Sequence, residues 1–419
     1  MRVDIIERDP TPFGLIRYGV APDHPRIKKI IKSLKRVLSN GDIRFIGNVD
    51  YGTDLKLDDL RLFYDVVIFA TGARKNRPMD IPGIDLRGSY SAADFVSWYD
   101  GHPDTHTEWP LEAESVAVLG AGNVALDVAR MLAKTADELL VTEIPDNVHR
   151  GLSKNAARDV HLFAHRGPAQ VKFTPMELRE LGHFPNIDVT VHPEGFELDE
   201  GSMEAIRASK SVKLVVDTLQ NYIAKDPEGN RHRIHIHFCQ SPVEVLGEDG
   251  QVVGLRTECT ELDGTGHARG TGELIDWPVQ AVYRAVDYLS DDLAGLPFDN
   301  VRGVVPNDGG RVIDIDGDAL PGVYVTGWIK RGPVGLIGHT KSDAAQTIEL
   351  LLTDLDTLVA PEQPEPEAVD RYLDSRGIAF TTWQGWEKLD SHELAQGQAQ
   401  GRERIKVVPR ADMVRISRA

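Results

Sequence analysis

A short apolar run that opens directly into a glycine turn restricts the fold of this chain more than any other feature. Residues 115–119 read Ser-Val-Ala-Val-Leu, and Gly120-Ala121-Gly122 follows at once, before a predicted helix. A buried strand, a glycine turn and a helix in this order are typical of a parallel α/β unit. Further strand-like runs, each ahead of a helical or glycine-rich stretch, lie at residues 3–7, 65–70, 160–164 and 322–326. We therefore expect an α/β protein with parallel sheets.

The glycine turn also has the form GxGxxA, because Asn123-Val124-Ala125 completes it. The first glycine permits the tight turn, and the second lets the backbone approach a pyrophosphate. A small third residue lets the helix pack closely on the strand, and the free N–H groups of the helix start can bind phosphate. The pattern predicts a dinucleotide-binding site at this turn.

The end of the next strand distinguishes NAD from NADP. An acidic residue there favours the free 2′-hydroxyl of NAD, whereas an arginine accommodates the 2′-phosphate of NADP. The strand at residues 160–164 ends in His165-Arg166, without an acid. Since a guanidinium group can bind phosphate with paired hydrogen bonds, we predict NADP(H). The alternative is that Arg166 only caps a strand end at the surface.

Composition excludes several other classes of protein. The 47 Lys and Arg residues against 65 Asp and Glu residues give a net charge of −18, which argues against non-specific nucleic-acid binding. Two cysteines, Cys239 and Cys259, form neither a CxxC redox motif nor a zinc or iron–sulfur site, and we predict no metal site. No apolar run is long enough for a membrane span, and the first residues lack the apolar stretch of a signal peptide. We expect a soluble, cytoplasmic protein.

Two further strand ends and one acid suggest a second nucleotide. Ala70-Thr71-Gly72 and Thr326-Gly327-Trp328 each follow a predicted strand, and Glu7 ends the first strand, where a ribose-binding acid is expected. Gly335-Leu336-Ile337-Gly338 precedes a helix whose N-terminal dipole could stabilise a reduced flavin. In this order, these elements resemble those of flavoproteins that bind two dinucleotides.

Longer motifs extend this similarity to a particular family. The chain resembles the adrenodoxin-reductase-type ferredoxin–NADP reductases across nearly its whole length. The motifs that carry the resemblance lie at residues 21–25 (APDHP), 70–72 (ATG), 122–130 (GNVALDVAR), 166–170 (RGPAQ), 173–181 (FT, then ELREL), 327–333 (GWIKRGP), 335–338 (GLIG) and 382–386 (TWQGW).

The resemblance implies an enzyme that transfers electrons between NADPH and a ferredoxin-like iron–sulfur protein through FAD. It implies that FAD contacts Glu7, Leu15, Val49, Trp328, Gly335, Leu336 and Ile337. It likewise implies that NADP(H) contacts Gly122, Asn123, Val124, Ala125, His165, Arg166, Glu177 and Gly335. By the same resemblance, His24 and Glu180 lie near the flavin and relay a proton, since histidine titrates near neutral pH. The alternative for His24 is a simple cap before the helix that starts at Pro25.

The implied architecture is two doubly wound, Rossmann-like domains, one inserted into the other. We expect a discontinuous FAD domain formed by residues 1–103 and 290–419, with an NADP domain at residues 104–289. Two departures from the family stand out. His165 replaces the first of two arginines, which predicts a weaker preference for NADPH. The family's first strand and its GxGxxG turn, which hold the FAD pyrophosphate, do not precede Glu7. Two alternatives follow from this second departure: an NADP(H)-binding remnant without flavin or activity, or a start codon that was assigned too late.

The predicted helix at residues 25–38 is strongly basic in an acidic chain. It carries six cations and no acid, and a basic face would attract an acidic ferredoxin. The residues expected to contact this partner are Lys28, Lys29, Lys32, Lys35, Arg36, Arg207, Lys210 and Lys213. The alternative is an ordinary solvated face of an amphipathic helix. We expect a monomer.

Overall fold

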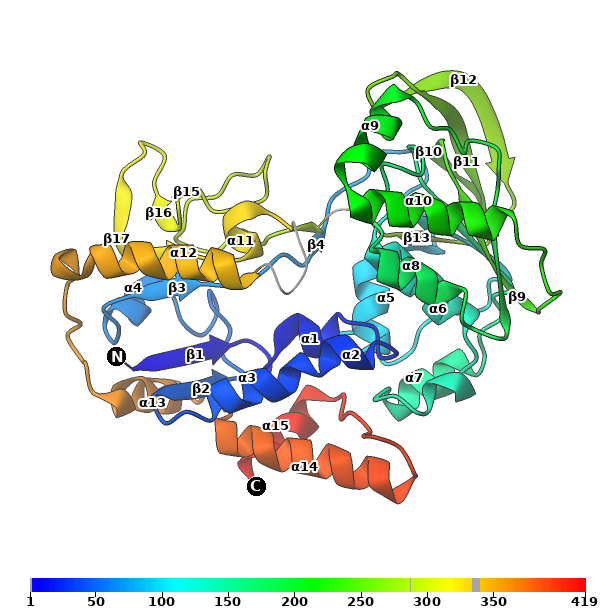
Figure 1. Ribbon diagram of the computed structural model, residues 1–419. Helices are drawn as coiled ribbons and strands as arrows, with labels where there is room; N and C mark the ends of the chain where they lie inside the picture. Colours follow the sequence, from blue (N-terminus) through cyan, green and yellow to red (C-terminus); the bar gives the residue numbers. More distant parts are fainter. Residues whose placement is uncertain (1, 287, 334–339) are drawn as a thin grey trace.

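The computed structural model describes residues 2–286, 288–333 and 340–419. Figure 1 shows two lobes, with the N-terminal strands in one and the centre of the sequence in the other. The expected α/β class is confirmed. Every neighbouring pair of strands in the largest sheet is parallel, and in the next largest sheet the strands that end at Phe69 and Val325 are parallel to each other. No helix in the part of the chain that the structure describes has the length and apolarity needed to cross a membrane.

The second lobe is built on a six-stranded sheet in the order β5-β13-β6-β7-β9-β8. Every neighbouring pair in this sheet is parallel. The strands are β5 (Ser89–Ser91), β13 (Ala281–Arg284), β6 (Ser115–Leu119), β7 (Asp159–Phe163), β9 (His232–His237) and β8 (Ile187–Val191). The chain leaves β6 on one side to form β7 and returns on its other side as β13. Such a reversal of strand order is where doubly wound sheets bind ligands, beyond the carboxyl ends of the strands.

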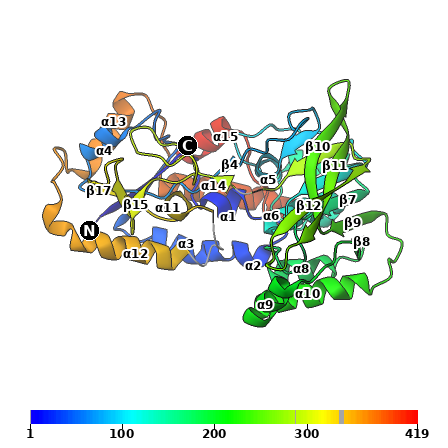
Figure 2. The same ribbon diagram turned by 90° about the horizontal axis from the view of Figure 1, so that it is seen from above.

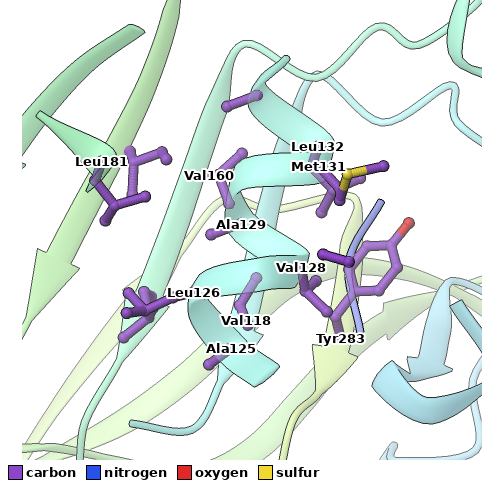
Figure 3. Close-up of a cluster of buried hydrophobic side chains, with 14 of the residues drawn as sticks. Val118, Ala125, Leu126, Val128, Ala129, Met131, Leu132, Val160, Leu181 and Tyr283 are labelled. Carbon is purple, nitrogen blue, oxygen red and sulfur yellow. The ribbon is translucent and has the colours of Figure 1, made fainter. Parts of the chain in front are cut away.

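Helix α6 (Asn123–Ala133) fills the core on one face of this sheet. Val118 of β6 and Val160 of β7 point to that face, and Leu126 and Ala129 of α6 pack against them (Figure 3). Side chains alternate between faces along a strand, so the neighbouring residues point the other way. The helices that complete this lobe are α5 (Ala92–Tyr99), α7 (Asp146–Leu152), α8 (Pro175–Leu181), α9 (Glu200–Ala208) and α10 (Lys210–Ile223).

A three-stranded antiparallel sheet covers part of the opposite face. It contains β10 (Gln240–Glu248), β11 (Gln251–Leu262) and β12 (Ala268–Trp277). Phe163 packs there with Val245 and Leu255. Seen from above, this small sheet lies at the opposite end of the molecule from α13 (Pro366–Ser375) (Figure 2).

Four histidines gather on this second face. The Nδ1 atom of His161 lies 3.1 Å from Nε2 of His237, and Nε2 of His192 lies 3.2 Å from Nδ1 of His235. Their rings stack, with centroids 4.6 Å apart for His161 and His235 and 4.3 Å apart for His192 and His237. Burial and the neighbouring rings lower the pKa of His161 to about 4 and that of His237 to about 2. We call this group the histidine ladder.

The first lobe contains two separate sheets. Strands β1 (Val3–Glu7) and β2 (Ile43–Gly47) pair in parallel. Strands β15 (Asn307–Asp308), β16 (Arg311–Ile313), β17 (Ala319–Val325) and β3 (Val67–Phe69) form the other, in that order. Among the described residues, β1 has a paired neighbour only in β2, and β3 only in β17. A short pair of β4 (Lys75–Asn76) and β14 (Tyr288–Leu289) joins the lobes.

The helices of the first lobe surround these sheets. They are α1 (Gly14–Tyr18), α2 (Pro25–Lys28), α3 (Ile30–Leu38), α4 (Leu57–Arg61), α11 (Trp328–Arg331) and α12 (Thr340–Thr353). The single helix predicted at residues 25–38 is therefore two helices, which meet at Lys29.

The C-terminal tail closes the molecule from below (Figure 1). Its helices α14 (Trp383–Ala399) and α15 (Arg410–Arg418) pack Trp386 and Met413 against Tyr18 and Phe45 of the first lobe. Buried ions reinforce this contact. The guanidinium of Arg17 pairs with Glu393 at 2.6 Å, and both side chains are at most 4% exposed. The tail thus completes the core of the N-terminal segment.

Candidate functional site

The glycine turn lies at the carboxyl end of β6, where the strand order reverses. Gly120 has φ 143°, and a Cβ there would lie 2.2 Å from the carbonyl oxygen of Ala285, so only glycine fits. Gly122 has an extended φ of −121°, and an added Cβ would meet nothing within 4 Å. Among the described residues, no side chain caps the start of α6. Open space beside uncapped N–H groups is what a phosphate group requires, so this turn fits the pyrophosphate of a dinucleotide.

The residues that follow the turn have different roles. Val124 is partly buried and Ala125 is fully buried, and both pack in the core beneath the turn. The Asn123 side chain accepts a hydrogen bond from the Thr174 N–H at 2.9 Å. Thr174 in turn caps α8 through the Glu177 N–H. Asn123 therefore fixes the position of α8 relative to the glycine turn.

His165 and Arg166 follow β7, beside the turn. Their carbonyl groups accept hydrogen bonds from the Thr260 hydroxyl at 2.8 Å and from the Cys239 N–H at 3.2 Å. The Lys172 N–H donates to the carbonyl of Ala121 at 2.7 Å, which brings a third cationic residue to the turn. Burial, then Arg166 and Lys172, lower the pKa of His165, so its imidazole is neutral at neutral pH. The positive charge here comes from Arg166 and Lys172.

The predicted pair His24 and Glu180 is brought together, with 3.4 Å between Nδ1 of His24 and a carboxylate oxygen of Glu180. Two other carboxylates lie closer. Nε2 of His24 is 2.8 Å from Glu177 and 3.0 Å from Asp127. Burial lowers the pKa of His24, but its hydrogen bonds to Asp127 and Glu177 outweigh this and raise it to about 9. Glu177, for which the resemblance implied an NADP(H) contact, lies at the imidazole in this structure.

Arg130 connects this histidine to a buried ion network. Its side chain is 0% exposed and binds both oxygens of Asp23, at 2.7 and 2.9 Å. It also donates to Asp127 at 2.8 Å, and Lys134 donates to Asp23 at 2.7 Å. A metal ion at this place would need Nε2 of His24 and a carboxylate oxygen of Asp127 as ligands. The guanidinium of Arg130 already contacts both atoms, so an ion-pair network explains why His24 and Asp127 lie together.

Sequence reasoning missed Asp23, Asp127 and Arg130. Asp127 and Arg130 are three residues apart on a predicted helix, so their shared face could have been noticed. Their contact with the segment before α2 could not, because it joins residues about a hundred positions apart.

Of the described residues predicted for FAD, Glu7, Val49 and Trp328 lie at or just after strand ends in the first lobe, whereas Leu15 lies in α1. Glu7 ends β1, Trp328 follows the end of β17, and Leu15 is 42% exposed. Val49 is 1% exposed, so only its backbone could contact a ligand. Gly335, Leu336 and Ile337 lie outside the described residues.

Two observations show how far these residues fit a flavin nucleotide. The Glu7 carboxyl accepts the Asp9 N–H at 3.1 Å and has no ion-pair partner within the described part of the chain. Burial, then the charge of Asp9, raise its pKa to about 7, and hydroxyl donors from a ribose would satisfy such a carboxyl. An added Cβ at Gly72 or Gly327 meets nothing within 4 Å, so the backbone at both strand ends borders open space. Glu7 and the two glycines therefore fit the ribose and the backbone contacts of a flavin nucleotide.

Known proteins with this arrangement identify its family. A family described as pyridine nucleotide-disulphide oxidoreductase matches residues 15–166. The NADPH-ferredoxin reductase FprA of Mycobacterium tuberculosis is 39% identical over 428 residues, which cover 99% of this chain and 92% of that protein. The mitochondrial NADPH:adrenodoxin oxidoreductase of Bos taurus is 37% identical over 99% of this chain and 86% of its own length. A solved structure of the M. tuberculosis FprA in complex with NADPH superposes with a TM-score of 0.92 at 37% identity, over 100% of this chain and 93% of that one.

The chain belongs to the adrenodoxin reductase and FprA family. The predicted resemblance is thereby confirmed at the level of the family. The match extends through the C-terminal tail, because the alignments cover 98% or more of the chain.

The basic residues expected to face a partner of such a reductase differ in exposure. Those with exposed side chains are Lys29, Lys32, Arg36, Arg207, Lys210 and Lys213. Seen from above, α3 and α9–α10 lie along the same edge of the molecule (Figure 2), although they belong to different lobes (Figure 1). Lys35 is 41% exposed and pairs with Asp390 of the tail at 3.0 Å.

The prediction for Lys28 is wrong. Its side chain is 9% exposed, and its ammonium contacts Glu143 at 2.5 Å and Asp100 at 3.4 Å. Pairing with these two carboxylates raises its pKa despite its burial. Lys28 holds α2 against the second lobe and cannot reach a partner.

Proposed function

We propose that this chain transfers electrons between NADPH and a ferredoxin-like iron–sulfur protein through FAD. The observation that carries the proposal is the open glycine turn at the reversal of strand order, with Arg166 at the end of the neighbouring strand. The named activities of relatives similar over almost the full chain support it. When bound, NADPH supplies a hydride and FAD exchanges electron pairs for single electrons.

Each part of the chain has a task in this proposal. Residues 1–103 and 290–419 form the FAD domain and residues 104–289 the NADP domain, although β5 and α5 of the first segment belong to the sheet and core of the second lobe. NADP(H) is held by the turn at residues 122–125, by His165 and Arg166, by Glu177 and by Gly335. FAD is held by Glu7, Leu15, Val49, Trp328 and residues 335–337. His24 and Glu180 hold and move a proton beside the nucleotides.

The exposed cations on α3, α9 and α10 form the proposed docking surface for the iron–sulfur protein. An acidic partner fits this surface because long-range attraction steers it there before contact. A chain of net charge −18 would otherwise repel such a partner.

A second candidate function has its own supporting observation. β1 and β3 each have one paired neighbour within the described residues, so the first lobe has two sheets where a doubly wound domain has one. We propose as the alternative that this division of the first lobe prevents flavin binding, and that these residues bind NADP(H) without flavin.

The visible absorption spectrum of the purified chain separates the two candidates. A flavin spectrum that NADPH bleaches without air, together with reduction of an added ferredoxin, is the expected result. A colourless protein that takes up no added FAD but binds 2′,5′-ADP would establish the remnant. A protein that binds neither ligand contradicts both.

The variant Gly122→Asp tests the phosphate site directly. The added side chain meets no atom within 4 Å, and aspartate is a favourable residue at a helix start, so the fold should be kept. Its carboxylate would occupy the phosphate position and repel the ligand. We expect 2′,5′-ADP affinity to fall at least about tenfold in a calorimetric titration, since one uncompensated charge costs about 1.4 kcal/mol or more. If Gly122→Asp binds 2′,5′-ADP as tightly as the unsubstituted protein and melts at the same temperature, the nucleotide does not bind at this turn.

A further inference from the structure

Arg130 makes a contact with His24 that its ion pairs alone do not explain. One nitrogen of its guanidinium lies 2.5 Å from Nε2 of His24, 2.9 Å from Asp23 and 2.8 Å from Asp127, so its two protons are shared among three acceptors. All of these side chains are buried or nearly so, with exposures of 0% for Arg130, 6% for His24 and 13% for Asp127. Water therefore screens this contact little.

The chemistry of the two groups makes Nε2 of His24 a contested atom. A guanidinium group only donates hydrogen bonds, so towards Arg130 the Nε2 atom must accept, with the ring proton on Nδ1. Nδ1 then faces Glu180 at 3.4 Å. Carboxylates only accept, so towards Glu177 and Asp127 the same Nε2 must carry a proton. The imidazole can satisfy one side at a time.

We propose that Arg130 is a positioning residue for His24: by competing with Glu177 and Asp127 for Nε2, it makes the imidazole exchange its proton more readily. The inference rests on the proposed function, in which His24 moves a proton. Without Arg130, only the three carboxylates would face the imidazole, and they would favour its protonated form more strongly still. With Arg130, the neutral ring also has a hydrogen-bond partner.

The charges around the imidazole determine the direction of the effect. Asp127 and Arg130 face it from α6, Glu177 and Glu180 from α8, and Asp23 lies beside it in its own segment. The carboxylates favour the protonated ring, and Arg130 opposes it. Removing Arg130 also frees Asp127 and Asp23 from a cation. All three changes raise the pKa of His24.

The test is a titration of His24 by NMR in the full chain, with isotope-labelled histidine and with His24→Gln to assign the signal. In Arg130→Met the midpoint should rise by roughly one pH unit relative to the unsubstituted protein, as expected for the loss of an adjacent buried cation. Lys134→Met is the matched control, because Lys134, directly after the end of α6, binds the same oxygen of Asp23 but has no hydrogen bond or ion pair with His24 among the described residues. Its midpoint should stay within a few tenths of a unit.

A second variant covers the case in which Arg130→Met does not fold. Asp23→Asn combined with Arg130→Met removes both members of the buried pair, which costs less stability than removing one. Its His24 midpoint should also rise, by a smaller amount. An unchanged midpoint in every folded variant, or a rise in Lys134→Met as large as that in Arg130→Met, would overturn the inference. The titration needs no flavin, so it stands even if the spectrum contradicts the proposed reductase.

Discussion

The imidazole of His165 follows β7 at the position where a second arginine would strengthen a 2′-phosphate site. Because burial and two neighbouring cations lower its pKa, His165 adds no charge at pH 7.5. In the proposed function, the discrimination between NADPH and NADH then rests on Arg166 and Lys172. In this function, the identity of residue 165 therefore determines how strongly the enzyme prefers NADPH over NADH.

His165→Arg should therefore increase the preference for NADPH. A second guanidinium can make charge-assisted hydrogen bonds to the phosphate, which predicts roughly a tenfold rise in the ratio of kcat/KM for NADPH over NADH. The measurement is steady-state reduction of an artificial electron acceptor with each nucleotide. Arg166→Ala is the comparison and should lower the ratio. If neither substitution changes this ratio, the 2′-phosphate does not bind at this strand end.

At the scale of residues, the sequence predicted which single residues come together better than it predicted the larger set of side chains that surround them. The His24 and Glu180 pair could be predicted because each lies in a motif shared with a known family. The closer contacts of His24 with Glu177 and Asp127 depend on how α6 and α8 approach each other, and local spacing does not report that approach. The burial of Lys28 was missed for a related reason, since its partners Asp100 and Glu143 belong to distant parts of the chain.

At the level of elements, α3 presents a cationic face with little acidic compensation. Lys32 and Arg36 are exposed and one helical turn apart, whereas Lys35 contacts the tail. Charge reversal at Lys32 and Arg36 thus changes the surface without breaking a described ion pair. We expect about a tenfold slower reduction of an acidic ferredoxin at low salt, with a flatter dependence on ionic strength.

The control for this experiment is Lys154→Glu, combined with a second exposed reversal at Arg302. Both residues are exposed and lie in other segments, so the pair changes the net charge equally. Similar slowing in both double variants would mean that net charge, not the α3 face, governs the encounter. Stopped-flow rates at several salt concentrations make the comparison.

The histidine ladder predicts a loss of stability in acid. His161 has a folded pKa of about 4, below the ordinary 6.5, so the unfolded chain binds a proton that the folded chain excludes. Stability is therefore fully present above pH 6.5 and decreases as the pH falls towards 4, by on the order of 2–3 kcal/mol for this group. Urea unfolding at pH 7.0 and 5.0 measures the difference.

His161→Leu should reduce that acid sensitivity. His161 lines a cavity of about 500 Å³ on the outer side of the sheet, so leucine can be accommodated there. The variant should lose about 1 kcal/mol at pH 7, because His237 loses a hydrogen-bond partner, but it should lose less between pH 7.0 and 5.0. If the difference between the two pH values equals that of the unsubstituted protein, the ladder does not cause the acid sensitivity.

At the scale of the whole molecule, the tail is held by ions that water cannot reach. Glu393→Gln leaves Arg17 as a buried cation without its carboxylate partner, which should cost about 3–5 kcal/mol of unfolding free energy. Removing both charges with Arg17→Met and Glu393→Leu should cost less than the single substitution. Chemical denaturation of the three proteins tests this order. A single variant that is more stable than the double one would show that Arg17 finds another partner.

Features that depend on neighbouring residues could be predicted from the sequence, whereas contacts between residues far apart in the sequence could not. Strands next to glycine turns were found because their pattern is local, as at β6 and β17. The division of the domains at residues 103 and 289 stays a prediction. In the structure, β5 (Ser89–Ser91) joins the sheet of the second lobe. The break at Lys29 and the docking of the tail on β2 arise from packing that one sequence does not display.

The pairing of Arg17 with Glu393 also has a consequence for protein synthesis. The two residues are 376 positions apart, so the ribosome makes the guanidinium long before its carboxylate. At about 5–20 residues per second, the N-terminal segment waits roughly 20–75 seconds before its core can close. During that interval Tyr18 and Phe45 lack the apolar surface of the tail that buries them in the complete protein. All six strands of the second lobe's sheet lie within residues 89–284, so this sheet is synthesised well before the tail and does not depend on it.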